Sequence, residues 1–164
     1  MFERWDSFLR TFASLSGQSV FDLETASEIG KVIDLSLDVA SQKVNGLVID
    51  QKGWFNQHLL LPIEKVRQFG TDGIVISSKN VLMPLNKKSL SLNEGKARLK
   101  GKPLLSTEGE KLGLVEDVYF QEEMGKIIGY EVTEGLLAEM KEGKKIVKTN
   151  APLIVGEEVL MIEI

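Results

Sequence analysis

Side chains that could supply a nucleophile, a general base or a soft metal ligand are scarce in this sequence. It contains no cysteine and a single histidine, His58, among 164 residues. The lack of cysteine removes thiolate chemistry, disulfides and cysteine-ligated metal centres. His58 follows Asn56 and Gln57, and one imidazole with carboxylates is a poor ligand set for zinc. We therefore expect His58 to lie in a loop or at a strand edge without a chemical role.

Two aspartates occupy equivalent positions and are the best candidates for acid–base chemistry. Asp34 and Asp117 lie 83 residues apart, each inside the same short sequence pattern. Two carboxylates act as an acid–base pair when burial or mutual repulsion separates their pKa values. A simpler interpretation is that each side chain accepts a hydrogen bond from a nearby backbone N–H group. Since two copies of one fold would repeat such a bond, we expect a structural role for both aspartates.

The other acidic clusters lack the order that a metal site needs. Glu108 and Glu110 flank Gly109, and Glu122 adjoins Glu123, but neither group has the ligand spacing of a calcium loop. Both are typical of solvated hairpin tips. The sequence also has no glycine-rich phosphate loop, no dinucleotide fingerprint and no serine–histidine–aspartate set that could be argued. We predict no catalytic residue, no cofactor and no metal site, and hence no enzyme.

Trp54 and Phe55 are the strongest candidates for contact with a partner protein. They follow Gly53 in a polar stretch, and adjacent residues of a strand point to opposite faces. One ring would then fill the core while the other stays exposed, and exposed aromatic rings are frequent anchors of protein interfaces. The alternative is that both rings plug one end of the core or meet the other half of the chain.

Charge is unevenly distributed along the chain. The net charge is −4 overall, −3 over residues 1–78, +6 over residues 79–102 and −7 over residues 103–164. A basic segment of this kind can bind a polyanion. Its candidate contacts are Lys87, Lys88, Lys96, Arg98, Lys100 and Lys102. The segment contains no aromatic residue, although single-stranded nucleic acid is generally bound by basic and aromatic side chains together. The alternative is a solvated connector that complements its acidic neighbours.

The elements that must position these residues occur as an internal sequence repeat of two copies. The matching blocks are Gly30–Leu35 with Gly113–Val118, Lys43–Gly46 with Lys126–Gly129, and Leu15–Val20 with Leu99–Leu104. The first two pairs match at an offset of 83 residues and the third at 84. Two small units therefore make up most of the chain. Units of this size bury only a modest core, so we expect each half to be stabilised by the other.

The pattern within each unit is that of β-strands. Gly46 and Gly129 stand at the same place inside the returning strands of two hairpins, where glycine indicates a bulge or a sharp bend. A repeated bend favours a small, strongly curved barrel over a flat sheet. In the second hairpin, Gly125 is expected to supply the positive φ that a tight loop needs.

The N-terminus carries an apolar stripe at helical spacing. The stripe consists of Phe2, Trp5, Phe8, Leu9 and Phe12. Such spacing predicts an amphipathic helix, which Gly17 would end. The polar face lacks the lysines of a membrane-surface helix. We therefore expect this helix to cap the core of the first unit, with self-association as the alternative.

Taken in order, these blocks resemble the PRC-barrel family, named after the H subunit of the photosynthetic reaction centre. The first copy of the pattern is carried by Leu15, Gly17, Val20, Ile29–Asp34, Gly46 and Gly70–Ile74; the second by Leu99, Gly101, Leu104, Leu112–Asp117, Gly129 and Gly156–Leu160. Leu61–Ile63 also fits the family, but the second copy has no equivalent. The resemblance implies non-enzymatic barrels that mediate assembly. Ribosome maturation factors carry one such barrel beside an RNA-related domain.

We predict a mainly β protein made of two small antiparallel PRC-type barrels in tandem, with short helices. The expected ranges are an N-terminal helix over 1–14, barrels over 15–78 and 99–164, and a basic connector over 79–98. The expected function is a protein-interaction adaptor, and the alternative is an RNA- or ribosome-associated factor that uses residues 79–102. No apolar run approaches the roughly 20 residues of a membrane span. We expect a cytoplasmic protein, and leave open a homodimer and peripheral attachment to a membrane complex.

Overall fold

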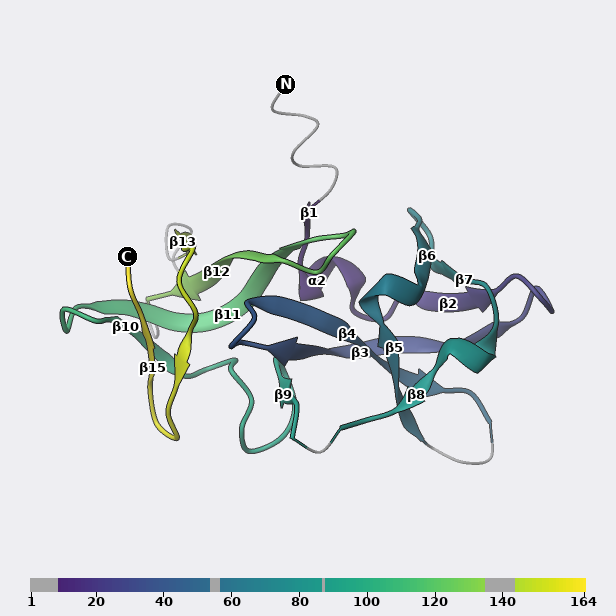
Figure 1. Ribbon diagram of the computed structural model, residues 1–164, viewed down its shortest axis with the longest axis horizontal. Helices are drawn as coiled ribbons and strands as arrows, with labels where there is room; N and C mark the ends of the chain where they lie inside the picture. Colours follow the sequence, from purple (N-terminus) through teal and green to yellow (C-terminus); the bar gives the residue numbers. More distant parts are fainter. Residues whose placement is uncertain (1–8, 54–56, 87, 135–143) are drawn as a thin grey trace, which may run out of the picture.

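The computed structural model describes residues 9–53, 57–86, 88–134 and 144–164. It is mainly β and has two halves that lie side by side along the long axis of the molecule (Figure 1). The first half contains β2 (Ser19–Asp22), β3 (Glu28–Asp38), β4 (Lys43–Gln51), β5 (His58–Pro62), the 3-10 turn η1 (Ile63–Lys65), β6 (Val66–Phe69) and β7 (Ile74–Ile76). The second half contains β10 (Pro103–Ser106), β11 (Lys111–Gln121), β12 (Ile127–Thr133), β13 (Lys144–Lys148), β14 (Ile154–Val155) and β15 (Leu160–Ile162).

Short elements precede and join the two halves. Ahead of the first half lie β1 (Leu9–Arg10) and the helix α2 (Phe12–Leu15). Between the halves lie η2 (Lys79–Val81), β8 (Met83–Pro84) and β9 (Leu90–Ser91). In the part of the chain that the structure describes, no helix is long and apolar enough to cross a membrane.

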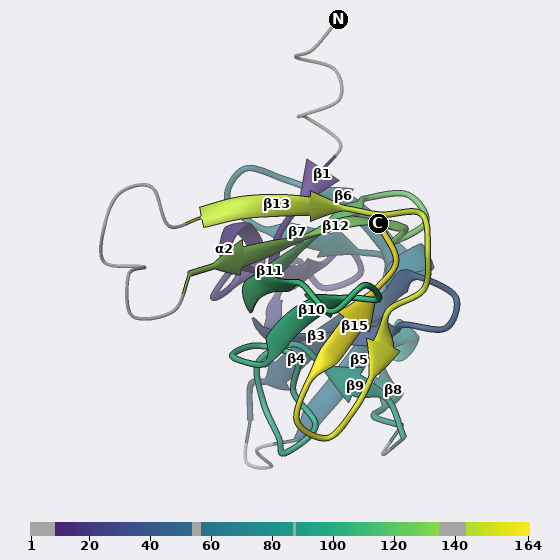
Figure 2. The ribbon, with the colours of Figure 1, turned by 90° about the vertical axis from the view of Figure 1, so that its left-hand side faces the viewer.

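Each half is one strongly bent sheet with the same strand order. In the first, neighbouring strands run β6-β7-β2-β3-β4-β5, with β8 added beside β5. In the second, the equivalent strands run β14-β15-β10-β11-β12-β13. The prediction of two β barrels is confirmed. The pairing is antiparallel except at one place in each half, where β2 pairs in parallel with β7 and β10 with β15. The expectation of wholly antiparallel barrels did not include this pair, which brings the last strand of each unit back beside its first. Figure 2 shows β15 beside β10.

The repeated glycines mark bulges and close approaches, as the sequence predicted. The register slips next to Gly46 in the β3–β4 hairpin and next to Gly129 in the β11–β12 hairpin. A Cβ atom on Gly46 would lie 2.6 Å from the carbonyl oxygen of Leu61, and one on Gly129 would lie 2.7 Å from that of Val147. These contacts leave no room for a side chain, so the third strand of each sheet can pair this closely with the hairpin only beside glycine.

The N-terminal segment differs from its prediction. A continuous helix was expected over residues 1–14, but among the described residues of that range Leu9 and Arg10 form a strand, and the helix α2 spans Phe12–Leu15. The physical reason is tertiary. Leu9 and Arg10 pair with Gln121 and Phe120 at the edge of β11, and Thr11 then starts the helix by accepting a hydrogen bond from the Ser14 N–H. Phe2, Trp5 and Phe8 lie outside the described residues.

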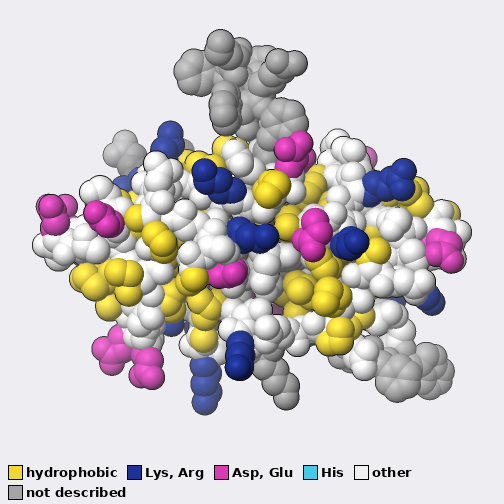
Figure 3. Space-filling model, in the orientation of Figure 1, with side chains coloured by type: hydrophobic (Ala, Val, Ile, Leu, Met, Phe, Trp, Pro, Cys, Tyr) yellow, Lys and Arg dark blue, Asp and Glu magenta, His cyan; other side chains and the backbone are white. Residues whose placement is uncertain are grey.

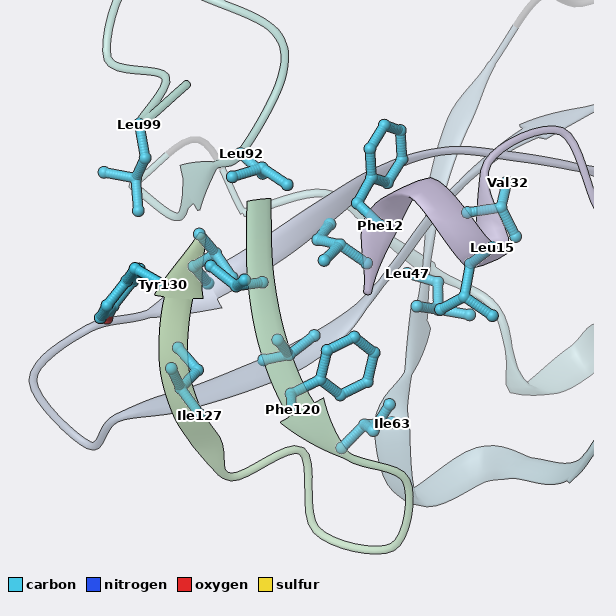
Figure 4. Packing of buried hydrophobic residues seen from close by; sticks show 14 of the residues in the cluster. Phe12, Leu15, Val32, Leu47, Ile63, Leu92, Leu99, Phe120, Ile127 and Tyr130 are labelled. Carbon is cyan, nitrogen blue, oxygen red and sulfur yellow. The ribbon is translucent and has the colours of Figure 1, made fainter. Parts of the chain in front are cut away.

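One apolar cluster runs through both halves (Figure 4). Val32, Leu47 and Ile63 contribute from the first half, and Phe120 and Tyr130 from the second. The segments ahead of each half add Phe12, Leu15, Leu92 and Leu99, which are buried in the same cluster. The expectation that the two small units stabilise each other is therefore met by a shared core.

Candidate functional site

Asp34 is buried at the inner side of the first barrel and holds the segment that leads into the second. Its Oδ1 atom accepts hydrogen bonds from the N–H groups of Leu35 and Asn93, both at 2.8 Å. Its Oδ2 atom accepts one from the N–H of Glu94 at 2.9 Å. Just before these residues, β9 pairs with β3 of the first barrel. The connector is thus anchored to the first barrel before it enters the second.

Asp117 of the second barrel accepts the equivalent set of bonds from the segment that leads into the first barrel. Its Oδ1 accepts from the N–H groups of Phe12 at 2.8 Å and Val118 at 2.7 Å, and its Oδ2 accepts from that of Ala13 at 2.9 Å. Phe12 and Ala13 lead into the first barrel, and the preceding β1 pairs with β11 of the second. Each barrel therefore grips the segment that precedes the other, and we call these two bond sets the reciprocal clamps.

The reciprocal clamps give the repeated aspartates the structural role that the sequence predicted. Asp34 and Asp117 are 2% and 4% exposed, and each carboxylate is occupied by three backbone N–H groups. Burial raises the pKa of Asp34 above its ordinary value of 3.8, while the bonds from Asn93, Leu35 and Glu94 oppose that rise. The two carboxylates are engaged in separate bond sets, so they do not form an acid–base pair.

A second reciprocal contact joins the tips of the two long hairpins. The N–H of Val44 donates to the carbonyl of Gly125 at 2.7 Å, and the N–H of Ile127 donates to that of Gln42 at 2.8 Å. Between these bonds Lys43 forms a β-bridge with Lys126. The donors and acceptors are equivalent at the offset of 83 residues. The interface therefore has the self-complementary form of a two-fold contact.

Arg10 adds a side-chain link between the barrels. Its guanidinium is 2.5 Å from a carboxylate oxygen of Glu122 in the second barrel. The same guanidinium lies 5.8 Å from the ring centroid of Phe69 in the first. Both side chains of the ion pair are partly buried, and a cation over an aromatic face is attracted by the ring quadrupole. Arg10 thus supports the packing of β1 between the two halves.

The absence of a chemical role for His58 stays a prediction, and the structure places this residue in a strand. His58 starts β5, opposite Asp50 on β4, and its Nε2 is 3.9 Å from an Asp50 oxygen, with both side chains exposed. Between β10 and β11, the N–H groups of Glu108 and Glu110 donate to the Ser106 hydroxyl. Among the described residues, no group of three or more His, Asp or Glu side chains is placed to hold a metal ion.

The structure separates the basic residues of the connector. The described candidates Lys88, Lys96, Arg98 and Lys100 are exposed and Lys102 is half-buried. Lys88 lines a hollow of about 350 Å³ beside Asp38, whereas Lys96 and Lys102 line another of about 500 Å³ beside Glu157. Each hollow therefore combines both signs of charge. Lys87 lies outside the described residues.

Trp54 and Phe55 also lie outside the described residues, so their role as partner contacts stays a prediction. Two exposed apolar side chains lie on or beside β8, the strand that pairs with β5. Met83 and Leu85 are 50% and 37% exposed, and the β5–β8 pairing brings Leu85 close to His58 at the start of β5. On the face shown in Figure 3, apolar side chains lie in small groups between charged side chains of both signs.

Two features of the structure were missed by the sequence reasoning. The first is the exchange of segments in the reciprocal clamps, whose only local signal is the apolar residue ahead of each repeat, Leu15 and Leu99. The second is that β13 is the end strand of its sheet among the described residues. Its signal was present as Lys144, Lys145 and Lys148 around two β-branched residues, since lysine is frequent on exposed edge strands.

Comparison with known proteins agrees with this geometry. The sequence is 27% identical over 150 residues to the uncharacterized protein YrrD of Bacillus subtilis (strain 168), covering 91% of this chain and 84% of that protein. The profile of the PRC-barrel domain matches twice, over residues 10–83 and 94–162. These two segments coincide with the two halves of the fold, and the chain therefore belongs to the PRC-barrel family as a tandem of two such domains.

Proposed function

We propose that this protein is a non-enzymatic adaptor whose two barrels act as one body in binding another protein. The observation that supports this is where the repeated residues lie. Asp34 and Asp117 form the reciprocal clamps, and the repeated glycines allow close pairing with the third strand of each sheet. The repeat therefore builds a rigid body, and its outward surfaces are left to make contacts.

The predicted anchor on the first barrel is the pair Trp54 and Phe55. Met83 and Leu85, on and beside β8, are exposed apolar side chains next to β5, the strand that follows this pair in the sequence. Aromatic side chains surrounded by apolar neighbours are typical hot spots of protein interfaces. Membership of the PRC-barrel family supports the same reading, since the family resemblance implies assembly modules.

An affinity capture of the full-length chain from lysate of its native source tests this proposal. We expect a protein partner that survives nuclease and high salt. The variant Trp54→Ala/Phe55→Ala should lose that partner while its denaturant midpoint stays unchanged. The matched variant Leu23→Ala, which removes another exposed apolar side chain of the first barrel, should keep it. Loss of the partner only together with unfolding of the double variant would place the two rings in the core instead.

The same experiment addresses the alternative of an RNA- or ribosome-associated factor. Exposed Lys88, Lys96, Arg98 and Lys100 are the residues that would contact RNA. Binding through such cations falls steeply with salt because it releases counterions. Recovery of RNA or ribosomal material that disappears with nuclease or with salt would favour this alternative over a protein partner.

A further inference from the structure

The two barrels differ in how the third strand of each sheet is covered. In the first barrel, β5 pairs with β4 on one side and with β8 on the other. In the second, β13 pairs with β12, and no strand among the described residues pairs with its other side. The two strands are equivalent, since β5 places Pro62 opposite Gly46 and β13 places Lys148 opposite Gly129. β13 therefore has an open edge where β5 has a neighbour.

The backbone groups at this edge follow from the alternation of a strand. Beyond the end of β13, the N–H of Thr149 donates to the carbonyl of Ile128 at 3.3 Å. Since alternate residues of a strand point their N–H groups to the same side, Ile146 points its N–H and C=O groups away from β12. Its equivalent in β5, Leu60, uses that side to pair with Met83 of β8. Ile146 thus presents the groups that Leu60 has already satisfied.

The side chains along β13 combine an apolar centre with basic flanks. Ile146 is 46% exposed, whereas Leu60 at the equivalent place is half-buried. Lys144 and Lys148 are exposed on the same face of the strand as Ile146. Lys144 also lies 3.6 Å from a carboxylate oxygen of Glu131 on β12, while its side chain stays largely exposed. If two copies of β13 paired antiparallel about Ile146, Lys144 would face Lys148, and like charges directly opposite each other are unfavourable. The edge therefore disfavours a second copy and favours an acidic strand.

We propose that the open edge of β13 binds an extended acidic segment of a partner protein, which adds a strand to the second barrel. The segment would carry an apolar residue opposite Ile146 and acidic residues two positions to either side, opposite Lys144 and Lys148. Main-chain hydrogen bonds would supply affinity, and the alternate side chains would supply specificity. This inference rests on the proposed adaptor function and names the chemistry of a partner site on the second barrel.

Titration of the ¹⁵N-labelled full-length chain tests the proposal. The probe is a short blocked peptide of sequence serine–glutamate–threonine–valine–threonine–glutamate–serine, and its control carries lysine in place of both glutamates. We expect the acidic peptide to shift the amide signals of β13 most strongly, and the control to bind at least tenfold more weakly. No shift of the β13 amides at millimolar peptide, or equal binding of the two peptides, would overturn the proposal.

Two variants show whether the edge itself is the site. Ile146→Pro removes the outward N–H that an added strand would use, and should abolish peptide binding. The fold should be kept, because that N–H group is not used in pairing with β12. Lys144→Glu/Lys148→Glu should weaken peptide binding about tenfold. The control Lys65→Glu/Lys111→Glu changes the net charge equally at exposed positions elsewhere, and it should leave peptide binding unchanged. Peptide binding that is unchanged in both edge variants would overturn the proposal. A dimer of the wild type in sedimentation that Ile146→Pro dissociates would also overturn it.

The outcome can be separated from that of the adaptor function. If a protein partner is captured from lysate and both edge variants keep it, the adaptor function stands and the β13 site is wrong. If the acidic peptide binds at β13 but no protein partner is captured, the edge is a strand acceptor and the adaptor function fails.

Discussion

At the scale of single residues, the repeated aspartates show how a carboxylate can serve the fold rather than a reaction. Asp34 and Asp117 each accept two backbone N–H bonds from the segment ahead of the opposite barrel. Replacing either by Asn turns one acceptor oxygen into a donor that faces an N–H group. We predict that Asp34→Asn and Asp117→Asn each lower the free energy of unfolding by about 1–3 kcal/mol, measured by urea denaturation. Exposed Asp72→Asn is the control and should change it by less than about 0.5 kcal/mol; equal effects at all three positions would contradict the clamps.

The pH dependence of Asp34→Asn follows from the direction of the Asp34 pKa. Burial raises this pKa above the ordinary value of 3.8, so the folded state holds the Asp34 proton more tightly than the unfolded state. The stabilisation from that proton is fully present below the unfolded value and is lost as the pH rises through the folded value. Since Asn does not titrate, the gap in stability between the wild type and Asp34→Asn should widen as the pH falls from 7 toward 4. If the gap narrows instead, the three N–H bonds outweigh burial in their effect on the pKa of Asp34.

At the scale of elements, the two hairpin tips make equivalent contacts with different residues. Gly125 has φ +72° and Gln42 has φ +56°, so both occupy the left-handed region, which costs a residue other than glycine about 1–2 kcal/mol. A Cβ atom on Gly125 would also lie 2.1 Å from the Val44 carbonyl oxygen. We predict that Gly125→Ala destabilises the protein by at least about 2 kcal/mol, whereas Gln42→Gly leaves it unchanged or stabilises it by up to about 1 kcal/mol. Thermal unfolding of the two variants checks this, and equal losses for both would refute the difference between the tips.

Sequence reasoning worked where the signal was local and periodic. Gly46 and Gly129 predicted the bulges because a strand interior tolerates glycine poorly unless the backbone bends or another strand crosses closely. Leu9 and Arg10 were predicted as helix and form a strand, because their pairing partner on β11 lies more than 100 residues away and outweighs local spacing. The parallel pairs β2–β7 and β10–β15 were missed for the same reason. Of the candidate site, the structural role of Asp34 and Asp117 could be predicted, but not that their bonds reach the segment ahead of the other barrel.

At the scale of the whole molecule, the repeat and the exchange of segments together decide how the protein is stabilised. Each barrel is a small unit that buries a limited core, yet Phe12, Leu15, Leu92 and Leu99 carry the core from one barrel into the other. The hairpin contact between Val44 and Gly125 closes the same interface from another side. Breaking the chain between the barrels would therefore not yield two independent domains, because each would lose the strand and the N–H groups that its partner's leading segment provides.

This exchange makes a prediction that a simple tandem would not. Deleting residues 1–13 cuts the chain ahead of the first barrel, but it removes β1 and two of the three N–H donors to Asp117 in the second barrel. It also removes buried Phe12, and loss of a core phenylalanine costs on the order of 3–5 kcal/mol. We expect hydrogen exchange to speed up at the amides of β11 and β12, although these strands lie about 100 residues from the cut. In Asp34→Asn the largest increase should instead fall on β3 and β9. Faster exchange confined to β2 and β3 in the deletion variant would mean that the N-terminal segment stabilises only its own barrel, and the reciprocal clamps would then not couple the two halves.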